Sequence, residues 1–172
     1  VNLRRSLAGQ RILLLGAGGA ARGVIAPLLA AQPASLLIAN RSADKAVALA
    51  RSFSDIAAST ETTAGPRVGA ANFAETAGKS FDVVINATSA SLSGESLPLP
   101  SGIFAAGSLA YDMMYGRGDT PFMVLARQQG AAHCADGLGM LVEQAAEAFF
   151  IWRGVRPETT AVLAELRTAL SA

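Results

Sequence analysis

Residues Leu13 to Gly23 read LLLGAGGAARG, and this stretch decides the fold. A short apolar run meets a cluster of glycines and alanines, and an apolar pattern with helical spacing resumes directly afterwards. Gly16, Gly18 and Ala21 form the spacing G-x-G-x-x-A. In a strand-to-helix turn that binds a dinucleotide, the first small residue permits the turn, the second admits a pyrophosphate, and the third lets helix pack on strand. The alternative is a tight turn whose small residues serve helix–sheet packing alone.

Outward from this turn, short apolar runs alternate with longer segments of helical spacing, which is typical of βαβ units. The expected strands are Arg11–Leu15, Ser35–Ala39, Asp82–Asn86, Ser108–Asp112 and Ala131–Cys134, with a weaker one near Val68 inside a surface loop over residues 59–72. The expected helices are Ala20–Ala31, Asp44–Phe53, Pro121–Gln129, Leu138–Arg153 and Pro157–Leu170. We therefore predict an α/β fold, a Rossmann-like, doubly wound, mostly parallel sheet of about six strands flanked by helices, with two C-terminal helices.

The residues after the second expected strand bear on which dinucleotide would bind. Sites for NAD usually carry an acidic residue here, whereas this sequence has Asn40 followed by Arg41. A guanidinium can form a charged, bidentate contact with the 2′-phosphate of NADP, which a carboxylate would repel. Ser42 can cap the next helix and donate to that phosphate, and Lys45 can add a positive charge on the same side. The sequence thus favours NADP, the alternative being that Arg41 and Lys45 are merely solvated charges.

Polar residues also follow later strands. Thr88 and Ser89 end the stretch DVVINATS, at the sheet edge where doubly wound folds bind ligands, so they would border the ribose and nicotinamide or simply begin a loop. Tyr115 in YDMMYG would line a site or pack against the fold. Gln144 lies on a helix stripe that we expect to face inward, so its amide would be bonded internally or face a polar cavity. The apolar members of that stripe are Leu141, Ala145, Ala148, Phe149 and Trp152.

Length and composition exclude several classes. The 172 residues suffice for one domain with a sizeable core, and a net charge of +1 with scattered arginines argues against nucleic acid binding. Without an apolar run of roughly 18 to 20 residues or a signal peptide, we expect a cytoplasmic protein with no membrane partner. The one cysteine, Cys134, excludes an internal disulfide, and with the one histidine, His133, it cannot make a structural zinc site, so no metal is expected. Because the sequence begins at Val1 without methionine, we expect a fragment of a longer protein.

The stretches GAGGAARG, NRS, INATS, YDMMYGRGDTPF and ADGLGMLVEQAAEAFFIWRGV, taken in order, resemble the shikimate dehydrogenase family. These enzymes use NADPH to reduce 3-dehydroshikimate in the chorismate pathway of aromatic amino acid biosynthesis. The resemblance runs from about Leu7 to the C-terminus and implies that residues 1–172 form a single NADP-binding Rossmann domain of a larger two-domain enzyme. It implies pyrophosphate contacts from Gly16, Ala17, Gly18, Gly19 and Ala20, 2′-phosphate contacts from Asn40, Arg41, Ser42 and Lys45, ribose and nicotinamide contacts from Thr88, Met113 and Gly137, and shikimate contacts from Tyr115 and Gln144.

The same resemblance implies what this chain lacks. The family's catalytic Lys and Asp, and most of its shikimate-binding groups, belong to an N-terminal domain that precedes the matching region. Here the lysines are Lys45 and Lys79, and neither has a suitable context. We therefore expect no catalytic residue in this chain, and NADP(H) binding without shikimate oxidation. Loss of the partner domain would also expose apolar side chains such as Phe149, Phe150 and Trp152, which favours a homodimer.

Other classes fit less well. A short-chain reductase needs the pattern Y-x-x-x-K, whereas Tyr111 is followed at that spacing by Tyr115. A methyltransferase typically carries an acidic residue where Asn40 stands. An NAD-preferring quinate/shikimate dehydrogenase is disfavoured by Arg41 alone, and a non-catalytic, nucleotide-binding Rossmann module remains the alternative from a different functional class.

Overall fold

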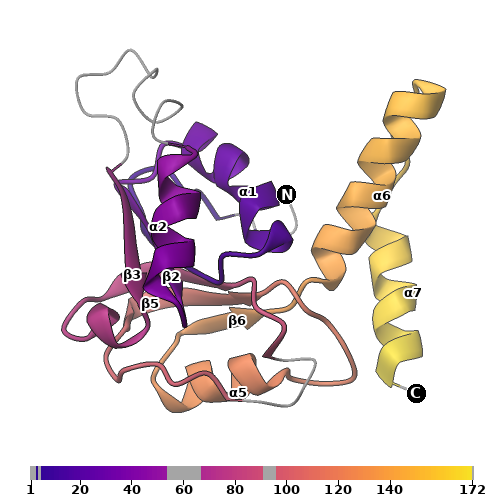
Figure 1. The fold of residues 1–172 in the computed structure, drawn as a ribbon. Coiled ribbons are helices and arrows are strands. Elements are labelled where there is room, and N and C mark those ends of the chain that lie inside the picture. Colours follow the sequence, from indigo (N-terminus) through magenta and orange to yellow (C-terminus); the bar gives the residue numbers. More distant parts are fainter. Residues whose placement is uncertain (1–2, 4, 54–66, 91–95, 172) are drawn as a thin grey trace.

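The computed structural model describes residues 3, 5–53, 67–90 and 96–171. A six-stranded sheet forms its centre in the order β3-β2-β1-β4-β5-β6, and every neighbouring pair is parallel (Figure 1). The strands are β1 (Arg11–Leu15), β2 (Ser35–Asn40), β3 (Arg67–Asn72), β4 (Phe81–Asn86), β5 (Phe104–Asp112) and β6 (His133–Ala135). The helices are α1 (Gly19–Ala30), α2 (Ala43–Arg51), the 3-10 turn η1 (Ala74–Thr76), α5 (Pro121–Gln128), α6 (Leu138–Arg153) and α7 (Thr160–Ser171). This confirms the predicted doubly wound α/β fold.

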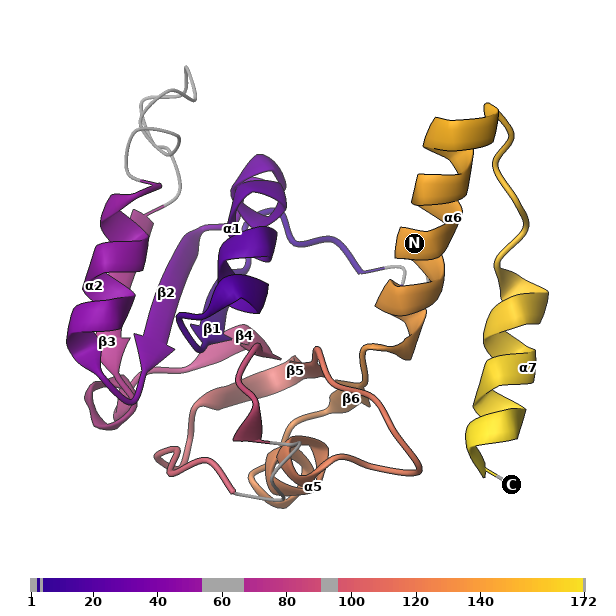
Figure 2. The same ribbon diagram turned by 45° about the vertical axis from the view of Figure 1, so that its right-hand side comes forward.

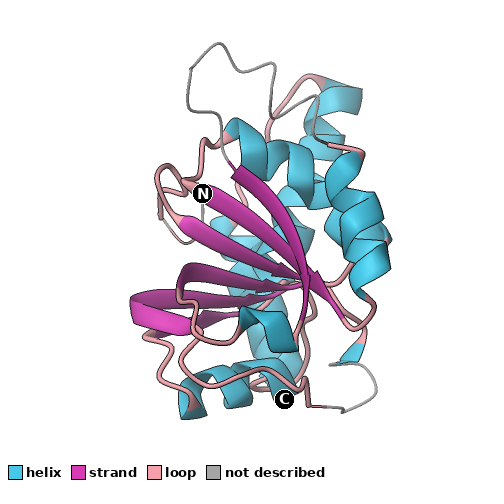
Figure 3. Ribbon diagram, turned by 60° about the vertical axis from the view of Figure 1, so that its left-hand side comes forward, coloured by secondary structure: helices cyan, strands magenta, loops and turns pink. Residues whose placement is uncertain are grey.

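Helices cover both faces of the twisted sheet, as Figure 3 shows. Strand β1 explains why this arrangement is stable, because its side chains feed two separate cores. Ile12 and Leu14 join the core formed with α1 and α2, whereas Leu13 and Leu15 join the core formed with α5. All four side chains are fully buried. A parallel strand buried on both faces reads as a continuous apolar run, which is the pattern that opens the decisive stretch.

The strand order reverses at β1, which pairs with β2 on one side and β4 on the other. Successive crossovers leave this strand in opposite directions, so the loops that follow β1 and β4 separate from one another at the carboxyl edge of the sheet. In open doubly wound sheets, ligands bind in the crevice at this point. The topology therefore predicts a ligand site at the carboxyl edge of the sheet, near Gly16.

The strand predictions differ from the structure mainly at the start of β5, which begins at Phe104 and not at Ser108. Phe81 of β4 faces Phe104, but Val83 faces Leu109, so β5 contains extra residues where it enters the sheet. An irregularity of this kind breaks the alternation that marks a strand in sequence. The weaker predicted strand near Val68 is β3, at the sheet edge, whereas residues 59–66 of that loop lie outside the described residues.

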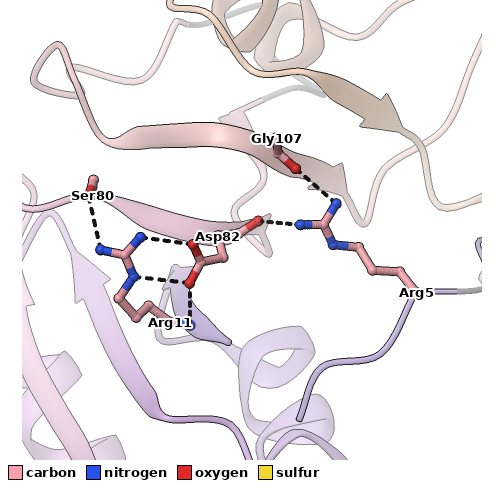
Figure 4. A network of polar contacts seen from close by, with 5 residues as sticks. All are labelled: Arg5, Arg11, Ser80, Asp82 and Gly107. Atoms are coloured by element: carbon pink, nitrogen blue, oxygen red, sulfur yellow. Dashed lines mark hydrogen bonds and ion pairs between the residues drawn. The ribbon is translucent and has the colours of Figure 1, made fainter. Parts of the chain in front are cut away.

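Two arginines fasten the amino ends of these strands (Figure 4). The Arg11 side chain donates to both carboxylate oxygens of Asp82, at 3.0 Å from Nε and 2.8 Å from Nη2, and its backbone N–H donates to Oδ2 at 2.8 Å. Arg5 donates to the carbonyl oxygens of Gly107 at 3.0 Å and of Asp82 at 3.3 Å. Arg5 thereby binds one backbone carbonyl of β4 and one of β5 where these strands pair irregularly, and it ties the N-terminal segment to the sheet.

Two helix ends are set by residues that adjoin the helix in the sequence. Thr120 caps α5 by accepting a hydrogen bond from the Met123 N–H at 3.2 Å, and Gly154 ends α6 in the left-handed conformation. Helix α7, however, begins at Thr160 and not at Pro157. The Thr159 carbonyl oxygen accepts a hydrogen bond from the Leu163 N–H at 2.9 Å, and the Thr159 hydroxyl donates to Glu143 of α6 at 2.7 Å.

Helices α6 and α7 lie side by side, beyond the β6 end of the sheet (Figures 1 and 2). Our prediction of which face of α6 points inward was wrong. Leu138, Val142 and Ala146 are its buried residues, while Gln144 is exposed. The predicted stripe is instead open to solvent at Leu141, Phe149 and Trp152, with Trp152 78% exposed. None of the helices in the described part of the chain is long and apolar enough to cross a bilayer.

Candidate dinucleotide site

A cleft of about 370 Å³ opens at the carboxyl edge of the sheet, at the reversal of strand order. It is built by the loops that follow β1, β4 and β5, by the last residue of β2 and by the first residues of α1. The lining residues are Gly16, Ala17, Gly18, Gly19, Ala20, Asn40, Ala87, Thr88, Ser89, Met113 and Met114. The structure therefore brings together most of the residues that the sequence singled out for a cofactor, although their role stays a prediction.

The three small residues of the G-x-G-x-x-A motif have three different environments. Gly16 has φ +108°, and a Cβ there would lie 3.0 Å from the Ala87 carbonyl oxygen and 3.2 Å from Thr88 Cγ2. Around Gly18, by contrast, no described atom lies within 4 Å of where a Cβ would stand. Ala21 is fully buried against the sheet. The first position thus serves the turn, the third serves packing, and the second leaves open space over the backbone.

Helix α1 begins at Gly19 and points its amino end into the cleft. The first N–H groups of a helix have no intrahelical partner, and with the helix dipole they attract anions. The preceding residue, Gly18, has no side chain that could occupy these donors, and the first turn contains no acidic residue. Phosphate oxygens are the ligand groups that this combination suits best.

The end of β2 contributes Asn40 to the cleft, and the Asn40 Nδ2 donates to the Ser42 carbonyl oxygen at 3.1 Å. Arg41, Ser42 and Lys45 are exposed and follow directly, at the start of α2, without lining the cleft. Ser42 occupies the N-cap position of α2, but among the described residues its hydroxyl makes no capping bond, contrary to the expectation that it caps the helix. Ser42 is exposed, as are Arg41 and Lys45, and these three exposed polar residues follow the end of β2.

A buried hydrogen-bond network holds the other wall of the cleft. Asn86 Oδ1 accepts from the Thr88 N–H at 3.0 Å and from the Thr88 hydroxyl at 2.7 Å. Asn86 Nδ2 donates to Asp112 Oδ1 at 3.0 Å, and the same oxygen accepts from the Met114 N–H at 3.0 Å. Asp112 Oδ2 accepts from the Thr120 hydroxyl at 2.6 Å. Sequence reasoning missed Asp112 and Thr120 as parts of the site, and it placed Asn86 at the end of a strand without assigning it a role there. The sequence signal for Asn86 and Asp112 is a single polar residue at the end of an otherwise apolar strand.

Gly137 lies behind the cleft wall and does not line the cleft. Its N–H donates to the Met114 carbonyl oxygen at 3.0 Å, and a Cβ there would overlap the Met113 carbonyl oxygen. The Met113 N–H in turn donates to the Asn86 carbonyl oxygen at 2.9 Å. In this structure Gly137 therefore lets the start of α6 pack against the residues that form the wall.

The predicted substrate contacts, Tyr115 and Gln144, are both exposed. Among the described residues, neither of them lines the dinucleotide cleft or the larger cavity beside α6. A larger, mainly apolar cavity of about 820 Å³ lies between α1, the sheet, α6 and α7. Burial raises the pKa of the Tyr111 phenol that lines it, and the negative charge of Asp136 raises that pKa further. The described residues contain no group of three or more His, Cys, Asp or Glu side chains suited to a metal ion.

Comparison with known proteins decides the family. Residues 2–93 match the model of the shikimate / quinate 5-dehydrogenase family, and residues 137–167 match that of the shikimate 5′-dehydrogenase C-terminal domain. The chain belongs to the shikimate / quinate 5-dehydrogenase family. The first match contains the glycine loop and the end of β2, and the second contains α6 and the start of α7.

Among curated members of this family, the shikimate dehydrogenase (NADP(+)) of Dechloromonas aromatica strain RCB is 75% identical over 171 residues. That match includes 99% of this chain but 59% of the relative, so the chain spans little more than half the length of such relatives. A crystal structure of an Ael1 enzyme from Pseudomonas putida has 49% identity and a TM-score of 0.83, over 96% of this chain and 57% of that one. The ligand-free 5-ketofructose reductase of Gluconobacter sp. strain CHM43 has 33% identity and a TM-score of 0.74, over 98% and 59%.

Proposed function

We propose that this chain forms the NADP(H)-binding part of a shikimate dehydrogenase, and that the cleft beside Gly18 receives the cofactor. The observation that carries this proposal is the open backbone at Gly18 and Gly19, where no described atom lies within 4 Å of a would-be Cβ. Side chains there would fill the space that a pyrophosphate needs, so the residues present fit the group. The 75% identity to a relative named for NADP(+) supports the choice of cofactor.

The roles of the cleft residues follow from their positions. The N–H groups at the start of α1 would bind the pyrophosphate oxygens between Gly16 and Ala20. Asn40 would border the adenosine ribose, since it lines the cleft at the end of β2. Thr88 and Met113 would border the second ribose and the nicotinamide on the opposite wall, with Gly137 supporting Met113 from behind. When bound, the cofactor supplies the hydride; these residues bind it, orient it and exclude water from one side.

Selection of NADP over NAD would rest on the exposed polar group after β2. Arg41 and Lys45 would pair their positive charges with the 2′-phosphate, and the Ser42 hydroxyl would donate to it. The amide of Asn40 carries no charge that would repel this phosphate. An NAD-preferring quinate/shikimate dehydrogenase is the second candidate, and it is disfavoured by this cationic group.

Turnover of shikimate by the chain alone is not expected. When hydride adds to a carbonyl carbon, negative charge develops on the carbonyl oxygen. The reduction therefore needs a proton donor close to that oxygen. Lys79 precedes β4, at the sheet edge away from the cleft, where its ammonium donates to the Glu75 carbonyl oxygen at 2.8 Å. Lys45 stands at the adenosine end. Shikimate and 3-dehydroshikimate contacts from Tyr115 and Gln144 are therefore proposed only for the longer, two-domain enzyme, and by itself the chain would behave as a nucleotide-binding module.

The remaining partners follow from the surface. The exposed apolar side chains Leu141, Phe149 and Trp152 of α6 would associate with a second copy of the chain when it is isolated. Neither nucleic acid nor membrane is proposed as a partner, and the cytoplasmic location expected from the sequence stays a prediction.

Titration of the purified chain with NADPH and with NADH, by calorimetry or by nicotinamide fluorescence, tests the proposed function. We expect saturable binding of NADPH, weaker binding of NADH, and no shikimate oxidation by the same preparation. Absence of NADPH binding by a folded chain would refute the cofactor assignment. Clear turnover would refute the assignment of the missing chemistry to another part of the protein.

A further inference from the structure

We infer that Asp112 is a positioning residue for the nicotinamide side of the cleft. This inference rests on the proposed function, because it concerns how the chain holds the wall against which the nicotinamide half of the cofactor would lie. Asp112 is the last residue of β5 and is fully buried, so it does not line the cleft itself. It acts through the residues that it binds.

One carboxylate joins the two loops that form this wall. Through Asn86, Asp112 reaches the loop after β4, because Asn86 donates to Asp112 and accepts both hydrogen bonds of Thr88. Through the Met114 N–H, it fixes the first turn of the loop after β5. Thr88 and Met114 both line the cleft, from different strands. The carboxylate therefore adds side-chain bonds between two cleft segments, which the backbone bond from the Met113 N–H to the Asn86 carbonyl oxygen also joins.

The network is selective in what it can affect. Its members lie at or after the carboxyl ends of β4 and β5, whereas the proposed pyrophosphate loop follows β1 and the exposed residues Arg41, Ser42 and Lys45 follow β2. Loss of the Asp112 carboxylate would remove an acceptor from the buried Asn86 amide, the buried Thr120 hydroxyl and the part-buried Met114 N–H, which favours rearrangement of these loops. The glycine loop and the start of α2 make none of these three bonds. We expect the nicotinamide half of the cofactor to lose contacts while the adenosine half keeps them.

The third bond of Asp112 provides a matched control. Thr120 donates to Asp112 Oδ2 and caps α5, so Thr120→Val removes a bond of the carboxylate and a helix cap together. It leaves Oδ1 with both of its donors, Asn86 and Met114. If the network only stabilises the fold, Thr120→Val and Asp112→Ala should affect ligand binding alike. If Asp112 positions the wall through Oδ1, the two variants should differ.

The test compares two ligands, NADPH and adenosine 2′,5′-bisphosphate, which carries the adenosine half with its 2′-phosphate but no nicotinamide. Dissociation constants are measured by calorimetry for the wild-type chain, Asp112→Ala, Asp112→Asn and Thr120→Val. We expect Asp112→Ala to weaken NADPH binding about tenfold while bisphosphate binding changes by less than about twofold. Asp112→Asn, which keeps an oxygen acceptor for Asn86 and Met114, should restore most of the NADPH affinity. Thr120→Val should lower the melting temperature and leave the ratio of the two affinities unchanged.

Equal weakening of both ligands by Asp112→Ala, or no weakening of either, would overturn the inference while the proposed function stands. If Asp112→Ala does not fold, Asn86→Ala decides in the same way, because it cuts the link between Asp112 and Thr88 and leaves Met114 and Thr120 bound. A wild-type chain that binds neither ligand would instead refute the proposed function, and the inference with it.

Discussion

Arg167 of α7 and Asp136 at the end of β6 form a two-pronged ion pair, with N–O distances of 2.6 Å and 2.7 Å. The Asp136 side chain is 2% exposed, whereas that of Arg167 is 49% exposed. Asp136 also accepts a hydrogen bond from the Leu138 N–H at 3.3 Å, at the start of α6. One carboxylate thus ties the C-terminal helix to the junction of β6 and α6, next to Gly137. The hydrogen bond to Asp136 raises the pKa of the Arg167 guanidinium.

Arg167→Ala is expected to release α7 from the rest of the fold. The substitution leaves the buried Asp136 carboxylate without its charged donor, which costs about 2 kcal/mol in the free energy of unfolding. Hydrogen exchange followed by mass spectrometry should show faster exchange over residues 160–171 with little change in β1. As a control, Arg156→Ala removes a guanidinium that pairs with the exposed Glu147, and it should cost less than about 1 kcal/mol. Equal protection of the α7 amides from exchange in both variants would contradict the proposal that Arg167 holds α7 to the fold.

Valine substitutions at Gly16 and Gly18 should separate folding from cofactor binding. At Gly18 the backbone is extended and the Cβ position is open, so Gly18→Val should cost less than about 1 kcal/mol of stability. Its side chain would occupy the space proposed for the pyrophosphate, and NADPH binding should fall by about tenfold or more. At Gly16 the positive φ and the nearby Ala87 carbonyl make the same change costly for folding, by about 1 to 3 kcal/mol or more. Thermal unfolding and NADPH titration of both variants check this contrast; tight binding by Gly18→Val would contradict it.

The parts of the fold that the sequence predicted well are those whose signal lies in neighbouring residues. Strand β1 is buried on both faces, so each of its positions from Ile12 to Leu15 carries the same apolar signal. The glycine loop follows immediately. No distant residue is needed to recognise these features.

The missed features depend on contacts between distant residues or on ambiguous periodicity. Asn86 and Asp112 are separated by 26 positions, and their hydrogen bond exists only because β4 and β5 pair in register. Helix α6 is apolar around most of its circumference, so its sequence offers both the stripe that includes Val142 and the stripe that includes Leu141. Periodicity could not choose between them. Which face is buried depends on the elements that pack against α6, and the sequence of α6 alone does not specify them.

Arg41→Asp is expected to remove the preference for NADPH over NADH. A carboxylate at the start of α2 would repel the 2′-phosphate and favour a ribose without it, so NADPH affinity should fall by about tenfold or more while NADH affinity holds or rises. Arg67→Asp makes the same charge change at the amino end of β3, on the opposite edge of the sheet, and serves as the control. Parallel titrations with both nucleotides check the prediction. An unchanged affinity ratio in Arg41→Asp would exclude Arg41 as the selecting residue.

The isolated chain is expected to self-associate through α6. Phe149 and Trp152 are 45% and 78% exposed, and burial of such aromatic side chains is a main source of association energy. Trp152→Lys should therefore weaken the dimer by about tenfold, measured by light scattering after size-exclusion chromatography. Val124→Lys is the matched control, because Val124 is a 43% exposed apolar residue on α5. A wild-type chain that remains monomeric at every concentration tested would rule out this surface as a self-association site.

The contact between Arg11 and Asp82 should make stability depend on acid pH. Hydrogen bonds from the Arg11 side chain are the main reason why the pKa of the Asp82 carboxyl lies below its ordinary value. Because the folded chain favours the ionised carboxylate, this contribution is fully present above the unfolded-state pKa of about 3.9 and is lost as pH falls through the lower folded-state pKa.

Asp82→Asn should therefore lower the free energy of unfolding near neutral pH, by less than about 1 kcal/mol since both side chains are partly exposed. Urea denaturation from about pH 7 to about pH 2.5 should show wild type and variant converging as the carboxylate becomes protonated. Glu158→Gln, in the exposed segment before α7, removes a carboxylate away from Arg11 and should run parallel to wild type over the same range. If the Asp82→Asn difference stayed constant down to the lowest pH, the substitution would be acting through packing, and the ionised pair would not be its cause.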